Sequence, residues 1–118
     1  MTTTTAKIDR KTLVDAFREA AAAALAADPG PGLEHDGGAC NFDTPAIQLP
    51  GIREKFVQDC ATEAGISASA FDWLGGRRWF FVLVPSYGQA NRRSIMAEAA
   101  CHRLKELGLE ALLYCQAD

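Results

Sequence analysis

The chain has 118 residues, and its 12 lysines and arginines against 15 aspartates and glutamates give a formal net charge of −3 at pH 7. Hydrophobic residues make up 48% and charged residues 23% of the chain, a globular composition that excludes a disordered or fibrous protein. The acidic balance argues against general nucleic-acid binding, because such domains are usually strongly basic. We predict a disordered tail over residues 1–7 and a single α+β domain over residues 8–118.

Nothing in the chain predicts export or membrane insertion. The segment from Met1 to Lys7 has no apolar core of the kind that a signal peptide needs. The longest apolar run, from Ala20 to Ala27, has eight residues, whereas a membrane span takes about 20. We therefore expect a cytoplasmic protein. The cysteines contain no Cys-x-x-Cys pair, which predicts reduced, partly buried thiols. They are Cys40, Cys60, Cys101 and Cys115.

The first predicted helix begins at Asp9, which can cap its first turn, and ends at Ala27. Ile8, before the cap, can pack on Leu13 as a hydrophobic staple does. Apolar side chains recur at helical spacing at Leu13, Val14, Phe17 and Leu25. Prolines and glycines then stop the helix and begin a linker over residues 28–38.

A strand and a helix are predicted after the linker. The strand covers residues 39–43 and is ended by Thr44 and Pro45, after which Ala46 to Leu49 either extend it or follow it irregularly. The helix covers about residues 50–64, because proline is tolerated in a first turn. Gly65 is the expected C-terminal stop of this helix.

Two apolar runs that flank Gly75 and Gly76 predict a tight β-hairpin with a two-residue turn. In that register Phe71 faces Phe80 and the two faces of the hairpin are both apolar. One face carries Phe71, Trp73, Phe80, Val82 and Val84. The other face carries Ala70, Leu74, Arg77, Trp79, Phe81 and Leu83.

A third helix and a last strand complete the predicted elements. Ser86 and Gln89 have capping-box spacing for a helix that runs to about Leu107. Gly108 resembles a Schellman stop for that helix. The last strand covers residues 110–116.

The order of these elements predicts a fold. After the N-terminal helix, residues 8–27, the order β-α-β-β-α-β over residues 39–118 is that of the ferredoxin-like antiparallel sheet, with strand order 4-1-3-2. Both crossover helices then cover one sheet face, and the second face, with Trp79, Phe81 and Leu83, needs another cover. We expect the N-terminal helix and a second copy of the chain to supply it. A ligand or nucleic acid stacked on Trp79 is the third possibility.

The segment Arg77-Arg78-Trp79-Phe80-Phe81-Val82 resembles the third-strand signature of RNA-recognition motifs, in which a basic residue starts the strand and alternate aromatics stack bases. Arg77, Trp79, Phe81 and Val82 match that pattern loosely. Arg78 and Phe80 stand where the family has small residues, and Val84 stands where it has an aromatic. The resemblance covers about eight residues and implies single-stranded nucleic-acid binding on the sheet face. The alternative is a hairpin whose arginines are solvated and whose aromatics belong to the core.

The start of the third helix is a second candidate site, because helix N-termini attract anions. Its residues are Ser86, Tyr87, Gly88, Gln89, Asn91 and Arg92. The predicted fold brings His35 to the same end of the sheet. A small anion or a partner's carboxylate fits such a site. The alternative is that the first residues only cap the helix while Arg92 and Arg93 face water.

No catalytic or metal-binding motif is recognised. His35 precedes Cys40, but the spacing of a nucleophile with its base or of a zinc site is absent. His102 has Glu98 and Glu106 on the same helical face, which predicts ion pairs. We therefore predict no catalytic residue, no metal and no cofactor.

These observations favour a small cytoplasmic binding or assembly module without catalysis, which self-associates or binds a protein partner. One alternative is a single-stranded nucleic-acid-binding domain that uses Arg77, Trp79 and Phe81. Another is a small-anion-binding protein or minor enzyme at the N-terminus of the third helix. None of the three interpretations involves a membrane.

Overall fold

The computed structural model describes residues 8–30, 40–73, 77–85 and 90–117. The elements of these residues are α1 (Arg10–Ala27), β1 (Cys40–Gln48), α2 (Glu54–Glu63), β2 (Ser67–Trp73), β3 (Arg77–Leu83), α3 (Ala90–Glu106) and β4 (Glu110–Ala117). The described part of the chain is therefore α+β, with three helices and a four-stranded antiparallel sheet. The expected tail over residues 1–7, most of the linker and the capping box at residues 86–89 lie outside the described residues.

Helix α1 begins and ends where the sequence predicts. The backbone N–H of Thr12 donates to Oδ1 of Asp9 at 2.8 Å, so Asp9 caps the helix. The same hydrogen bond holds the pKa of the Asp9 carboxyl below its usual range. The helix ends before Asp28, whose N–H donates to the carbonyl of Leu25 at 3.2 Å. Among the described helices, none combines the length and the apolar character that a bilayer crossing requires.

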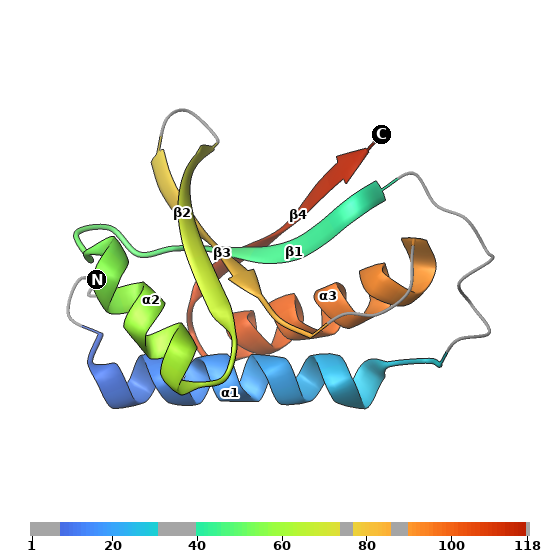
Figure 1. The fold of residues 1–118 in the computed structure, drawn as a ribbon, viewed down its shortest axis with the longest axis horizontal. Coiled ribbons are helices and arrows are strands. Elements are labelled where there is room, and N and C mark those ends of the chain that lie inside the picture. The colour runs from blue at the N-terminus through green and yellow to red at the C-terminus, as the bar shows by residue number, and fades with distance from the viewer. Residues whose placement is uncertain (1–7, 31–39, 74–76, 86–89, 118) are drawn as a thin grey trace.

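Helix α1 lies on the same side of the sheet as α2 and α3, and runs beneath them in Figure 1. Its buried side chains, such as Phe17, share one core with Phe80 and Val82 of β3. The prediction that this helix covers the second sheet face is therefore wrong. The physical reason is its small-residue face, on which Ala20 and Ala24 are fully buried and let a neighbouring helix approach closely.

Strand β1 does not end at Thr44 and Pro45, as the sequence predicts, but continues to Gln48. It is an interior strand between β3 and β4, where a proline normally leaves an acceptor without its N–H partner. The hydroxyl of Thr44 donates to the carbonyl of Val82 on β3 at 2.8 Å. The Thr44 hydroxyl therefore gives β3 a hydrogen-bond donor next to Pro45, which has no N–H, so β1 can continue past the proline.

Helix α2 begins at Glu54 and not at Pro50, so that boundary was predicted too early. Gly51 has a φ of 79°, a left-handed conformation that cannot belong to a right-handed helix. The N–H of Ile52 donates to the carbonyl of Leu49 at 3.2 Å, which closes a turn before the helix. The predicted stop at Gly65 is confirmed by its φ of 87°.

The sheet has the strand order β2-β3-β1-β4, which reads 4-1-3-2 from the β4 edge. In the hairpin, Phe71 pairs with Trp79 and Trp73 pairs with Arg77, so the predicted register, with Phe71 opposite Phe80, is wrong by one residue. Because side chains alternate between faces along a strand, a shift by one residue moves every side chain of β2 to the other face relative to β3. The residues that connect the strands, 74–76, lie outside the described part of the chain.

The observed register separates the large from the small side chains of β2. Toward the helices, Ala68 and Ala70 of β2 pair with Val82 and Phe80 of β3. These small residues leave room for α2, whose Glu54 carboxylate accepts a hydrogen bond from the N–H of Ala70 at 3.2 Å. Phe71 and Trp73 of β2 and Trp79 and Phe81 of β3 gather on the opposite face, whereas Phe80 fills the core on the helix side. The register therefore follows from close helix packing on one side of the sheet.

Candidate functional site

The sheet face turned away from the helices carries a cluster of aromatic rings, and we call this face the open face. The rings belong to Phe71, Trp73, Trp79, Phe81 and Tyr114. Phe71 stacks on Phe81 with ring centroids 3.7 Å apart, and Trp73 meets Trp79 edge to face at 5.2 Å. Tyr114 of β4 lies edge-on to Phe81 at 5.0 Å and to Trp73 at 5.2 Å. Rings from both edge strands thus meet over the two central strands, in geometries that favour aromatic pairs.

The ring cluster buries its own centre and leaves its margin open. Trp79 is 3% exposed, whereas Trp73 and Tyr114 are only half-buried. Two leucines at the margin are more open, with Leu83 at 36% and Leu112 at 39%. The cluster therefore shields Trp79 without any helix, but it presents a continuous apolar surface around it.

Of the two arginines in the segment that resembles an RNA-recognition motif, the register separates only Arg78 from Trp79 and Phe81. Trp79 and Phe81 share the open face, and they are joined there by the rings of β2 and β4. Arg78 belongs to the opposite face of β3, so it leaves the aromatic cluster. Arg77 pairs with Trp73 in the register, but its side chain lies outside the described residues.

Sequence reasoning missed Phe71, Trp73 and Tyr114 as members of this cluster. The sequence does show the alternation of aromatic residues along each strand, and the faces predicted from it are correct within β2 and within β3. The relative register of the two strands decides which rings meet, and one residue in the connection changes that outcome. Tyr114 joins the cluster across β1, where its partner in the register is the small Thr44.

The expected anion site at the start of the third helix lies largely outside the described residues, including His35 and residues 86–89. Asn91 is described by its backbone alone. Arg92 is described, and its Nε and Nη2 donate to the two carboxylate oxygens of Asp28 at 2.8 and 3.0 Å. The two side chains are 15% and 20% exposed, so this bidentate ion pair is partly shielded from water. It fastens the end of α1 to the first turn of α3.

This ion pair lowers the pKa of the Asp28 carboxyl. The hydrogen bonds from Arg92, together with the N–H of Gly30 at 2.9 Å, lower the pKa of Asp28 to about 2. An external anion at this corner would have to compete with the carboxylate of Asp28 for the Arg92 guanidinium. The geometry of Arg92 thus indicates a structural ion pair that joins α1 to α3.

Replacement Arg92→Ala should lower the melting temperature by several degrees at neutral pH, because it leaves the partly buried Asp28 carboxylate without its partner. The pKa of Asp28 is lower in the folded chain than its ordinary value of 3.8, so the pair stabilises the fold above about pH 4. That contribution is lost as the pH falls toward 2. Thermal unfolding from pH 8 to pH 2 measures both effects. Lys105→Ala, at an exposed position, is the control. An unchanged melting temperature for Arg92→Ala at pH 7 would contradict the structural role of the ion pair.

A buried acid that the sequence analysis did not single out lies on the helix-covered side of β1. Asp43 is 4% exposed, and neither of its carboxylate oxygens has a hydrogen-bond partner. Burial raises the pKa of this carboxyl, and the positive charge of Arg93 opposes the rise. The only sequence signal was its position in the alternation with Pro45 and Ile47, whose side chains face inward.

The remaining reactive residues fit structural roles. Cys60 and Cys101 are free and buried, as predicted, and burial raises the pKa of both thiols. The side chains of the other two cysteines lie outside the described residues. The predicted ion pair on α3 is confirmed, since Nε2 of His102 lies 3.3 Å from Oε2 of Glu106. Within the described ranges, no group of three or more His, Cys, Asp or Glu side chains is placed to hold a metal ion.

Comparison of the chain with models of protein families, with curated proteins and with solved structures finds no match. The class of the protein therefore follows from its architecture alone, an α+β domain with one sheet face under helices and one aromatic face. The open face is its principal candidate site, because a large apolar surface on a small domain usually takes part in binding.

Proposed function

We propose that this chain is a small self-associating binding and assembly module, and that its open face packs against the open face of a second copy. The observation that carries the proposal is the ring cluster on a sheet face that α1, α2 and α3 leave uncovered. Sheets of two molecules can pack face to face with about 10 Å between them. We propose no catalytic step for this module.

The chemistry of the open face supports a second copy as the occupant. Its described polar side chains are mostly uncharged, such as Thr44 and Gln48, and Glu110 adds one acid at the edge. Two copies of a chain with net charge −3 repel each other least where their contact surfaces carry few charges. A twofold arrangement also places each aromatic cluster against an identical one, so that one surface serves both partners.

The alternatives find less support. Single-stranded nucleic acid needs several cations beside the stacking rings, whereas the chain has a net charge of −3 and, of the two arginines at the start of β3, only Arg77 is in register with a residue of the ring cluster, Trp73. A small-anion site at the start of α3 needs Arg92, whose guanidinium already holds Asp28. The nucleic-acid alternative remains an outcome of the experiment below.

We further propose a ferredoxin-like classification for residues 39–118. The order β-α-β-β-α-β after α1 and the strand order 4-1-3-2 from the β4 edge support it. A cytoplasmic location is also proposed, and the free buried thiols of Cys60 and Cys101 support it, because thiols stay reduced in that compartment.

The variant Leu112→Glu tests self-association. Leu112 is 39% exposed at the margin of the open face, so the single chain tolerates a charge there. In a twofold contact each introduced carboxylate is buried against the apolar face of the partner, which costs several kcal/mol. We expect light scattering to give twice the 12.7-kDa chain mass for the wild type and the single mass for the variant. The dimer dissociation constant should rise by at least about 100-fold.

The matched control is Leu25→Glu, which places the same charge on an exposed leucine of α1, 48% exposed and on the helix side of the molecule. It should leave the dimer intact. A monomeric wild type at its highest soluble concentration would overturn the proposal, as would equal effects of both variants. Oligonucleotide retention that weakens steeply with salt and is lost in Trp73→Ser would support the nucleic-acid alternative.

A further inference from the structure

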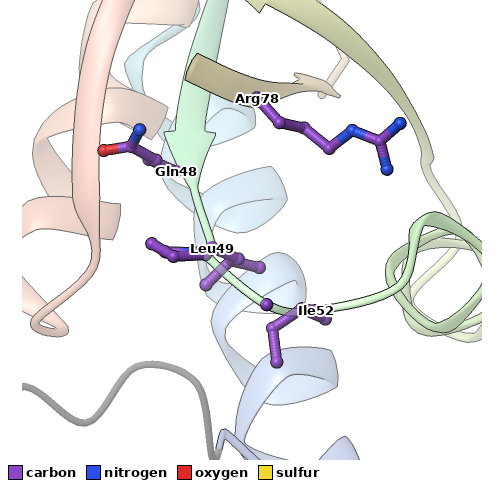
Figure 2. A pocket seen from close by; sticks show the side chains of 6 residues that line it. Gln48, Leu49, Ile52 and Arg78 are labelled. Atoms are coloured by element: carbon purple, nitrogen blue, oxygen red, sulfur yellow. The ribbon is translucent and has the colours of Figure 1, made fainter.

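A groove borders the segment that links β1 to α2, and nothing in the proposed self-association uses it. Its first hollow, of about 490 Å³, is lined by Gln48, Leu49, Pro50, Gly51, Ile52 and Arg78. Figure 2 shows Arg78 reaching out above this segment, on the side of α2, while Gln48 points to the other side of β1. A second hollow, of about 210 Å³, has Gly51 and Ile52 in common with the first and is also lined by Ile8, Arg53 and Phe56.

The floor of this groove is apolar and shaped by the chain itself. Ile52 and Phe56 are partly buried against the core and present their remaining surface to the hollows. Gly51, with its φ of 79°, makes the turn between the hollows without adding a side chain to them. A ligand that occupies both hollows therefore needs an apolar body that crosses Ile52.

Two arginines border the groove without an ion pair, although Asp72 lies opposite Arg78 in the register of β2 and β3. Most described arginines face a carboxylate of the chain, as Arg10 faces Glu63 at 2.8 Å and Arg103 faces Glu19 at 2.9 Å. Among the described residues, Arg53 and Arg78 form no hydrogen bond or ion pair with another side chain. Arg53 and Arg78, which form no ion pair with an acid among the described residues, thus border the same groove.

The nearest acid of α2 does not neutralise them. Glu54 follows Arg53 in the chain, but its Oε2 accepts hydrogen bonds from the N–H of Ala70 and from Nε2 of Gln58, both at 3.2 Å. These two hydrogen bonds hold the charged carboxylate of Glu54 toward β2. The groove keeps a positive rim over an apolar floor.

We propose that this groove binds an organic monocarboxylate with an unbranched apolar tail. The Arg78 guanidinium pairs with the carboxylate in the larger hollow, because its planar fork matches two carboxylate oxygens. The tail crosses Ile52 and ends against Phe56 in the second hollow, with Arg53 adding positive potential at that end. Inorganic phosphate fits the site less well, because much of its surface would face an apolar floor.

Titration calorimetry of the full chain with sodium octanoate tests the proposal. We expect saturable binding, and about tenfold weaker binding of hexanoate, because each buried methylene contributes about 0.8 kcal/mol. Arg78→Gln should weaken octanoate binding by at least about tenfold, since it removes a charged hydrogen-bond pair. The exposed position of Arg78 means that the variant should fold as the wild type does, which circular dichroism checks.

Two controls separate this groove from the open face. Lys105→Gln removes an exposed positive charge elsewhere and should leave octanoate binding unchanged. Trp73→Ser alters the open face and should also leave it unchanged, whatever its effect on self-association. Absence of saturable octanoate binding would overturn the proposal. Equal binding by the wild type and Arg78→Gln, or loss of binding in Trp73→Ser alone, would also overturn it.

Discussion

Deletion of residues 1–27 should turn this chain into an aggregating protein. Helix α1 lies along α3 and against α2, and it contributes Leu13, Phe17 and Ala20, each fully buried, to the core. Without α1, the apolar sides of the other two helices face water and form a large exposed patch. Sedimentation of the expressed protein and binding of a hydrophobic dye measure the outcome. A soluble truncated protein with unchanged sheet and helix content would contradict this role of α1.

A single substitution in α1 measures how much this helix contributes to the stability of the core. Phe17→Ala should lower the free energy of unfolding by about 3–5 kcal/mol, the usual range for removing a buried aromatic ring and leaving a cavity. Small domains have about 5–15 kcal/mol in total, so the variant should be close to unfolding at body temperature. Urea denaturation measures the change. Leu25→Ala, on the same helix but 48% exposed, is the matched control and should stay within about 0.5 kcal/mol of the wild type.

The second large effect is an expected gain in stability. Asp43→Asn should raise the free energy of unfolding at neutral pH by about 1–3 kcal/mol, because it replaces an acid whose buried oxygens lack hydrogen-bond partners with a neutral side chain of the same shape. Asp72→Asn, an exposed acid on β2, is the matched control and should change little. A less stable Asp43→Asn would show that the attraction of Arg93 outweighs the burial of the charge.

The pH dependence of this gain has a defined sign. The pKa of Asp43 is raised in the folded chain above its ordinary value of 3.8, so the folded state binds a proton at a pH where the unfolded state does not. The wild type therefore recovers stability as the pH falls through the folded pKa toward 4. The difference between Asp43→Asn and the wild type should be largest at pH 7 and above, and should shrink on acidification. A difference that grows as the pH falls would contradict the assignment.

The partly correct prediction of the open face shows how far local patterns reach. Trp79 and Phe81 alternate with Phe80 along one strand, and their placement on a common face needed only the period of a strand. Their neighbours across the hairpin depended on the register, which an error of one residue in the turn reversed. The sequence analysis therefore identified a two-sided apolar sheet and assigned the wrong partners to its rings.

The candidate anion corner shows a different kind of failure. Arg92 was correctly placed near a helix start, where basic and amide side chains attract anions. Its partner is Asp28, 64 positions earlier in the chain, and no local pattern couples the two. An arginine near a helix terminus has the same sequence context whether it binds a ligand or a carboxylate of its own chain.

Taken by itself, the sequence determined the order of helices and strands, the cap at Asp9 and the stop at Gly65. These features follow from hydrogen bonds and backbone angles within a few residues, which side-chain chemistry sets directly. Only the tertiary structure decided where α1 packs, which rings share the open face and which acid holds Arg92. Those outcomes depend on the shapes and charges of segments far apart in the chain, where small side chains permit close approach and buried charges require partners.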